Sequence, residues 1–244
     1  MKKATKCWLI LATALILVGC ILFGGVMTML NWDFSKLSTA SYSTNRHSVE
    51  EAFSHISLQT VTASIRFLPA EDGRTSVVCH EPDNQKHSVT LRGDTLVIER
   101  IDTRQWYEHI GLYFEPTQIT VYLPQTEYGS ISLQNTTGEV SLQNIRAAAL
   151  DISSTTGDIS LTDVVCTGDL SVQLTTGHIR LEDSDAATLA LKTVTGSVSG
   201  TLLTGKTFTA KAVTGGIDIP DTTGGSCRIT TTTGSITIRI RSGE

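Results

Sequence analysis

The chain has 244 residues and a net charge of −5, and three of its lysines lie within the first six residues. Without Lys2, Lys3 and Lys6 the remainder carries a charge of −8. This argues against nucleic acid or another polyanion as a partner, because such binding needs clustered Lys and Arg.

The first 30 residues predict a membrane-anchoring helix. The run from Cys7 to Leu30 is uncharged and mostly apolar. As a helix, residues 8–30 reach about 34 Å, enough to cross a hydrocarbon core of about 30 Å. The preceding lysines place the amino terminus in the cytoplasm by the positive-inside rule. We therefore expect residues 1–30 to be a cytoplasmic basic tip and a single-pass signal anchor in the cell membrane, with the carboxyl-terminal domain extracytoplasmic.

An alternative is lipidation at Cys20, because "LVGC" at Leu17–Cys20 resembles a lipobox. Against it, Ile21 to Leu30 stay apolar, and the apolar core of a cleaved signal is only about 7–15 residues long. The sequence favours the retained helix, and both alternatives leave the rest of the chain outside.

Residues 31–48 are rich in Ser, Thr and Asn without an apolar period, which predicts a flexible tether. From Val49 onward nearly every segment has strand composition. The segments "HISLQ", "SIRFL", "SVVCH", "SVTL", "TLVIE" and "QITVYL" are bounded by turns such as "EDGR" and "RGD".

A Thr-Gly turn then repeats with a period of 19 or 20 residues. Each turn is followed by an aliphatic residue two positions after the glycine and preceded by two aliphatic columns. The turn residues are Thr137, Gly138, Thr156, Gly157, Thr176, Gly177, Thr195, Gly196, Thr214, Gly215, Thr233 and Gly234.

This period predicts a solenoid in which each unit is one coil stacked on the next. Glycine permits positive φ at the corner, and the stacked threonine hydroxyls can bond along it. The fold class is therefore all-β: a single-domain parallel β-helix, or β-solenoid, over residues 49–244. Residues 49–127 form irregular early coils and residues 128–244 form regular ones. Ile56–Leu68 matches "ISLQNTTGEVSL" with Ala63 in place of Gly138, which predicts a degenerate first coil.

Metal and cofactor sites are not expected. Asn144, Asp163 and Asp183 form a partial ladder at a second corner, but Leu202 breaks it. Turn capping is the favoured interpretation and a bound cation the alternative. The spacing of the cysteines after the helix is not that of metal ligands; these are Cys79, Cys166 and Cys227. We interpret them as small buried residues, and a disulfide between two of them is the alternative.

Enzyme chemistry has little support, because the six histidines are scattered and no nucleophile or P-loop motif is present. Asp158 and His178 would lie on adjacent coils as an acid and a base, but no nucleophile accompanies them. We expect no catalytic residue.

Aromatic residues concentrate in one segment, Arg104 to Pro116. It reads either as a hydrophobic lid over an early coil or as a partner-binding loop. Its aromatic residues are Trp106, Tyr107, Tyr113 and Phe114.

With its basic tip, apolar helix, "ISLQTVTASIRFLP", "ITVYLP" and repeated "TTGDISL" units, the chain resembles the bacterial putative adhesin family of membrane-anchored proteins, LiaG-like proteins among them. The resemblance implies an extracytoplasmic β-solenoid associated with cell-envelope stress systems, without catalytic residues. The first hypothesis is a non-enzymatic envelope interaction surface. The alternatives are an accessory regulator of a stress-sensing system and a glycan-active enzyme.

The last coil, "TTTGSITIRIRSGE", is expected to form the exposed end of the solenoid. Outward Arg239 and Arg241 would discourage edge-to-edge pairing there. We therefore expect the ectodomain to be monomeric.

Overall fold

The computed structural model of the chain describes residues 3–33, 41–102, 115–202, 207–214, 217–218 and 226–240. The chain divides into two compact units: residues 1–41 with 105–115, and residues 42–104 with 116–244. The first unit holds helix α1 (Lys3–Met29) and the second holds all the strands. The prediction of a mostly β chain with one amino-terminal apolar helix is confirmed.

Helix α1 is 27 residues long. The most apolar 18-residue window within its segment Thr5–Met29 has a mean hydropathy of 2.7. At about 1.5 Å per residue α1 spans about 40 Å. It is therefore long and apolar enough to cross a membrane.

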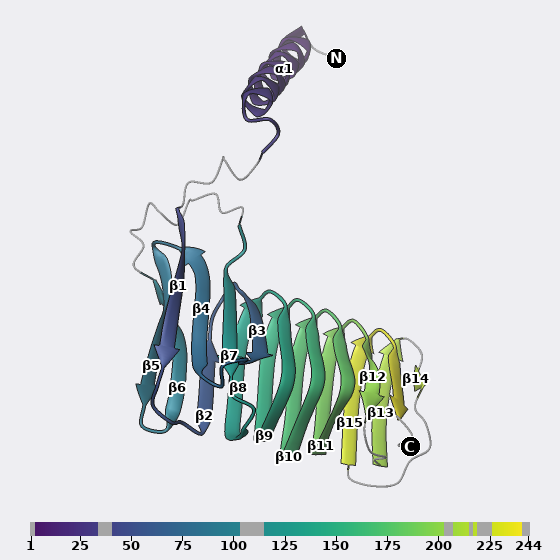
Figure 1. Ribbon diagram of the computed structural model, residues 1–244. Coiled ribbons are helices and arrows are strands. Elements are labelled where there is room, and N and C mark those ends of the chain that lie inside the picture. Colours follow the sequence, from purple (N-terminus) through teal and green to yellow (C-terminus); the bar gives the residue numbers. More distant parts are fainter. Residues whose placement is uncertain are drawn as a thin grey trace. The chain divides into compact units, whose positions relative to one another are not determined.

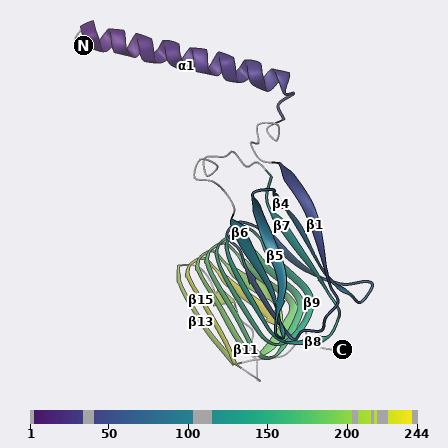
Figure 2. The ribbon, with the colours of Figure 1, turned by 90° about the vertical axis from the view of Figure 1, so that its left-hand side faces the viewer.

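The strands of the second unit form one mixed sheet of 16 strands (Figures 1 and 2). Those before the regular repeat are β1 (Tyr42–Val49), β2 (His55–Gln59), β3 (Ser64–Pro69), β4 (Thr75–Pro82), β5 (Gln85–Arg92), β6 (Thr95–Asp102) and β7 (Gln118–Leu123). The repeat begins with β8 (Glu127–Thr137), β9 (Val140–Thr156), β10 (Ile159–Thr176) and β11 (Ile179–Thr195). It continues with β12 (Val198–Leu202), β13 (Thr207–Thr214), β14 (Ile217–Asp218), β15 (Ser226–Thr233) and β16 (Ile236–Ile240).

The sheet bends so that two walls enclose the core. Strand β9 pairs with β3 through Val140–Leu142, but with β8 from Arg146 onward. Each long strand from β9 to β11 thus contributes to both walls. Inward aliphatic side chains from the two walls form one continuous buried cluster.

Within the repeat, adjacent units pair in parallel at equivalent positions. Ile159 lies opposite Val140 on one side and Ile179 on the other, and Leu161 lies between Leu142 and Leu181. All six side chains are at most 1% exposed. Burying a side chain of this size stabilises the fold by about 1.5–3 kcal/mol, so the aliphatic columns explain why the units stack in register.

The predicted degenerate unit is confirmed. Ile56 lies opposite Ile131 and Ile65 opposite Val140, both in parallel pairing. These are the partners that the sequence match gives. Ala63 occupies the corner where the regular units have glycine.

Two predictions about residues before the repeat are wrong. The tether was expected to reach residue 48, but β1 begins at Tyr42 and pairs with β4. Parallel coils were expected from residue 49, but β1–β4, β4–β7 and β5–β6 are antiparallel. The reason is local for β5 and β6: the two-residue turn at Gly93, which has φ of 62°, permits only an antiparallel hairpin.

The units also do not stack in chain order. At the amino-terminal end, β2 lies between β6 and β8, and β3 lies between β7 and β9. At the other end, β15 lies between β11 and β13, and β16 lies between β12 and β14.

The last unit in the sequence is therefore not the last in space. Arg239 does not lie on an edge strand, which overturns its predicted role as an edge guard. Arg241 lies outside the described residues. The unit formed by β13 and β14 stands at this end of the sheet instead.

Candidate functional site

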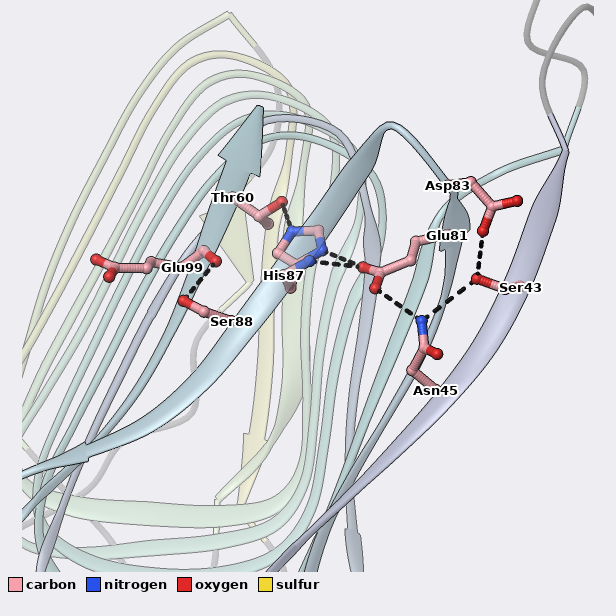
Figure 3. Close-up of polar contacts among 8 residues, drawn as sticks. All are labelled: Ser43, Asn45, Thr60, Glu81, Asp83, His87, Ser88 and Glu99. Atoms are coloured by element: carbon pink, nitrogen blue, oxygen red, sulfur yellow. Dashed lines mark hydrogen bonds and ion pairs between the residues drawn. The ribbon is translucent and has the colours of Figure 1, made fainter. Parts of the chain in front are cut away.

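A buried polar cluster lies at the amino-terminal end of the sheet (Figure 3). Glu81 lies on the same inward-facing side of β4 as Val77 and Cys79. Its side chain is 1% exposed. His87 comes from β5, where the chain has crossed to the other wall, and its side chain is 2% exposed. Residues 83–84 between the two strands bring these side chains together.

The Glu81 carboxylate is held by three donors. Its Oε2 accepts hydrogen bonds from the His87 backbone N–H at 2.9 Å and pairs with the His87 ring Nδ1 at 2.7 Å. Its Oε1 accepts from Asn45 Nδ2 at 3.4 Å. A buried carboxylate needs such compensation, because an unpaired charge is expensive to remove from water.

On the other side of the ring, His87 Nε2 lies 2.8 Å from the Thr60 hydroxyl. With Nδ1–H directed at the carboxylate, a neutral ring has Nε2 as an acceptor, so Thr60 donates to it. The order carboxylate, imidazole, hydroxyl is that of a catalytic relay. However, the Thr60 backbone N–H donates to Gln134 O at 2.9 Å, so it is not available to stabilise a developing oxyanion. These contacts favour a structural role.

The Thr60 corner also borders an open pocket of about 760 Å³, here named the corner pocket. It is formed by the carboxyl-terminal ends of β2 and β6 together with β8 and β9. Its lining is polar apart from Val61. The lining residues are Gln59, Thr60, Val61, Glu99, Arg100, Gln134, Asn135, Thr136 and Ser153.

The corner glycines of the repeat are in backbone conformations that L side chains rarely adopt. Their φ angles are 130°, 128°, 137°, 141° and 144° at Gly138, Gly157, Gly177, Gly196 and Gly234. A Cβ on Gly177 would lie 2.0 Å from the carbonyl oxygen of Gly157. Gly215 lies outside the described residues.

The corner threonines of the described units, such as Thr137 and Thr156, are exposed. In the part of the chain that the structure describes, backbone hydrogen bonds join adjacent corners, and the hydroxyls of the threonines directly before the glycines do not. Gly138 N–H donates to Thr156 O, and Gly157 N–H donates to Thr176 O. The predicted hydroxyl ladder along the corner is wrong.

The second corner is built by Asn144, Asp163 and Asp183, with φ of 56°, 51° and 47°. Asn and Asp tolerate this left-handed conformation better than other non-glycine residues. Asp163 also forms an ion pair with Arg146 at 2.8 Å. The described residues hold no group of three or more Asp, Glu, His or Cys side chains placed to bind a metal.

Other predicted pairs are placed as follows. Asp158 Oδ1 accepts from the backbone N–H of His178, while the His178 ring Nδ1 faces Ser197 Oγ at 2.7 Å. The carboxylate therefore does not orient the imidazole.

Cys79 and Cys166 are buried free thiols, so no disulfide joins them. Burial, and for Cys79 also the charge of Glu81, raises the pKa of each to about 12.

The aromatic segment cannot be assessed in the same way, since Trp106, Tyr107, Tyr113 and Phe114 lie outside the described residues. By connectivity, residues 103–117 join β6 to β7. These strands pair with β2 and β3, which flank the Thr60–Ala63 corner.

Comparison with known proteins agrees with this architecture. Residues 53–244 match the Toastrack DUF4097 family. The chain belongs to this family. No curated protein matches it in sequence.

Two solved structures that match this chain are distant from it in sequence. One is described as a putative cell adhesion protein from Clostridium sporogenes. It is 13% identical, with a TM-score of 0.53, over 82% of this chain and 100% of that chain. Another, a putative adhesin from Bacteroides fragilis, is 15% identical over 81% of this chain and 97% of that chain, with a TM-score of 0.39. At this identity the first shows likeness of fold alone.

The buried cluster and the corner pocket were not found from the sequence. One signal was present for the cluster: Glu81 stands two residues after Cys79 and four after Val77, which puts a carboxylate on an inward position of a strand. The pocket had no such signal. Its walls come from four strands whose pairing does not follow chain order.

Proposed function

We propose that this protein is a non-enzymatic, membrane-tethered interaction domain of the bacterial cell envelope. Helix α1 crosses the cell membrane with its amino terminus in the cytoplasm. The extracytoplasmic domain is a monomeric β-solenoid with coils of 19–20 residues and an adhesin-like role. It acts as a rigid surface to which an envelope component binds.

The observation that carries this proposal is the corner pocket on a domain attached to an apolar helix. The pocket is open, and its polar side chains can fix the orientation of a bound ligand through hydrogen bonds. The neighbouring Thr60–His87–Glu81 array supports a non-enzymatic role, because the backbone N–H of Thr60 itself is already bonded to Gln134 O. The net negative charge of the domain supports a partner other than a polyanion.

Topology is tested with a membrane-impermeant maleimide on intact cells that carry Thr137→Cys, an exposed corner position. Buried Cys79 and Cys166 give little background. Labelling without lysis is expected, and labelling only after lysis would overturn the extracytoplasmic assignment.

Interaction is tested by placing a photo-reactive residue at Thr136, which lines the corner pocket, or at Thr175 two units along the same column. In intact cells we expect a covalent adduct with an envelope component at Thr136 and much less at Thr175. Equal or absent cross-linking at both positions would contradict the proposal, as would turnover of wall polysaccharide by the purified protein.

A further inference from the structure

The corner pocket is built on a regular outward row of polar side chains. Gln59 pairs with Gln134, which pairs with Ser153, and Glu99 lies on the far side of Gln59. These positions are adjacent along the sheet, so their side chains stand about 4.8 Å apart. The row therefore presents several hydrogen-bonding groups to one ligand.

The two charged residues of the pocket each have a partner. Glu99 pairs with Arg92, and Arg100 has an interaction of its own. The side chains of Gln59, Gln134, Thr136 and Ser153, in contrast, make no hydrogen bond within the described part of the chain. The groups left for a ligand are thus mainly uncharged amides and hydroxyls. The Nε of Arg100, which has no hydrogen-bond partner within the described structure, is a further donor that a ligand oxygen could accept from.

A buried acceptor at the same place lacks a partner. Asn135 is 7% exposed and donates through Nδ2 to Ala63 O at 3.0 Å. Its Oδ1 has no hydrogen-bond partner within the described structure. An unsatisfied buried acceptor costs about 1–3 kcal/mol, so a donor that reached this buried atom would offset that cost.

With the neutral His87 ring described above, Thr60 adds a second acceptor, because its proton is directed at His87 Nε2 and its lone pairs remain available. The amides offer both donors and acceptors. A mixed set of this kind matches hydroxyl groups, since each hydroxyl donates once and accepts twice. A volume of about 760 Å³ lies within the usual range of about 300–1,000 Å³ for small-molecule sites.

We propose that the corner pocket binds an uncharged, hydroxyl-rich ligand, namely a sugar unit of a neutral glycan. This inference rests on the proposed function, since the glycan would be the envelope component that the domain recognises. The described lining offers no aromatic ring for stacking, so the affinity of a single site is expected to be weak.

The test uses the full-length protein in a zwitterionic detergent, because sugar-headed detergents would compete. The probes are a neutral N-acetylglucosamine tetramer, its deacetylated cationic counterpart and an anionic galacturonate tetramer. Binding is measured by titration calorimetry and by saturation-transfer NMR. We expect saturable binding of the neutral tetramer, with both charged tetramers at least about tenfold weaker.

The matched variants are Gln134→Ala and Gln173→Ala. Both side chains are exposed and occupy the same outward row, but only Gln134 lines the pocket. Gln134→Ala should weaken binding about tenfold and Gln173→Ala should leave it unchanged, with equal melting temperatures for the two.

Absence of saturable binding, preference for a charged tetramer, or equal loss in both variants would overturn the inference. If binding fails while photo-reactive Thr136 still cross-links in cells, the glycan is wrong and the interaction domain stands. If the cross-link also fails, the proposed function is lost with it.

Discussion

The repeat from β8 to β11 and the amino-terminal end from β1 to β7 are parts of one sheet built by different means. In the repeat, each unit contacts neighbours with the same pattern, so one column of aliphatic residues and one of glycines specify the structure. At the amino-terminal end, strands pair in both directions and the interior includes Glu81 and His87. The repeat thus gains stability from many equivalent apolar contacts, whereas the amino-terminal end adds to its apolar core a few polar contacts that occur only once.

The largest expected effect is an all-or-none difference in disulfide formation, which reports the order in which the units stack at the carboxyl-terminal end. Thr195 lies opposite Thr233, and Thr233 lies opposite Thr214. A Thr195→Cys, Thr233→Cys double variant should form a disulfide after mild oxidation, detected by mass spectrometry. Thr195→Cys with Thr214→Cys should not, because two strand spacings exceed the Cα separation that a disulfide tolerates.

The pair Thr156→Cys and Thr176→Cys, on adjacent strands of the repeat, is the positive control. A disulfide between positions 195 and 214 would mean that the units stack in chain order there too. The two regions would then differ only at the amino-terminal end.

The corner glycines should show the largest energetic effect. Gly177→Ala places a Cβ 2.0 Å from Gly157 O at a φ of 137°. We expect it to lower the free energy of unfolding in urea by about 4 kcal/mol or more. Gly73→Ala is the control: its φ is 67° and nothing lies within 4 Å of the added Cβ, so about 1–2 kcal/mol is expected. Equal losses would mean that the corners are looser than the structure shows.

The next largest loss of stability is expected when the Glu81 carboxylate is removed from the buried cluster. Glu81→Ala leaves His87 and Asn45 without their acceptor and should cost roughly 3 kcal/mol in urea unfolding. Arg146→Ala removes an ion pair whose side chains are 45% and 38% exposed, and should cost about 1 kcal/mol or less. A Glu81 variant as stable as the Arg146 variant would show that the irregular end does not depend on this pair.

A smaller effect is expected inside the repeat corner. Thr231 is fully buried and its hydroxyl donates to Gly196 O at 2.9 Å. Leu174 stands at the equivalent position of an earlier unit and has no hydroxyl to donate. Thr231→Val should lower the free energy of unfolding by about 1–2 kcal/mol, because a buried carbonyl loses its donor. The neighbouring exposed change, Thr232→Val, should be close to neutral. If both are neutral, the corner tolerates an unpaired carbonyl at every unit.

A pH trend should be shared by both regions, since Cys79 lies in β4 and Cys166 in β10. Burial raises the pKa of each thiol from 9.0 to about 12. The neutral thiols therefore contribute stability that is complete below pH 9 and is lost as the pH rises toward 12. Urea midpoints should fall between pH 8.5 and 10.5, and Cys79→Val with Cys166→Val should flatten this slope. An unchanged slope would assign the trend to other groups.

The structure of the repeat could be predicted from the sequence more fully than that of the amino-terminal end. The pairing of Ile56 with Ile131 was predictable because both segments carry the same pattern of inward and outward residues. The hairpin of β5 and β6 was missed because the turn at Gly93 was taken as a coil corner. The corner pocket was beyond prediction, because Arg100 and Gln134 reach the same place only through a stacking order that the sequence does not encode locally.

The inserted position of the last unit has a consequence for synthesis. Residues 207–218 leave the ribosome before residues 226–240, yet their strands pair with β15 and β16 and not with the preceding unit. The slot beside β11 and β12 therefore has to stay open until the later segment arrives. Until it does, the unit formed by residues 207–218 lacks its neighbour and one place in the sheet is unfilled. A second copy that offers its own residues 226–240 at that moment has the right pattern to fill this place, so the fold has a route to domain swapping at this end.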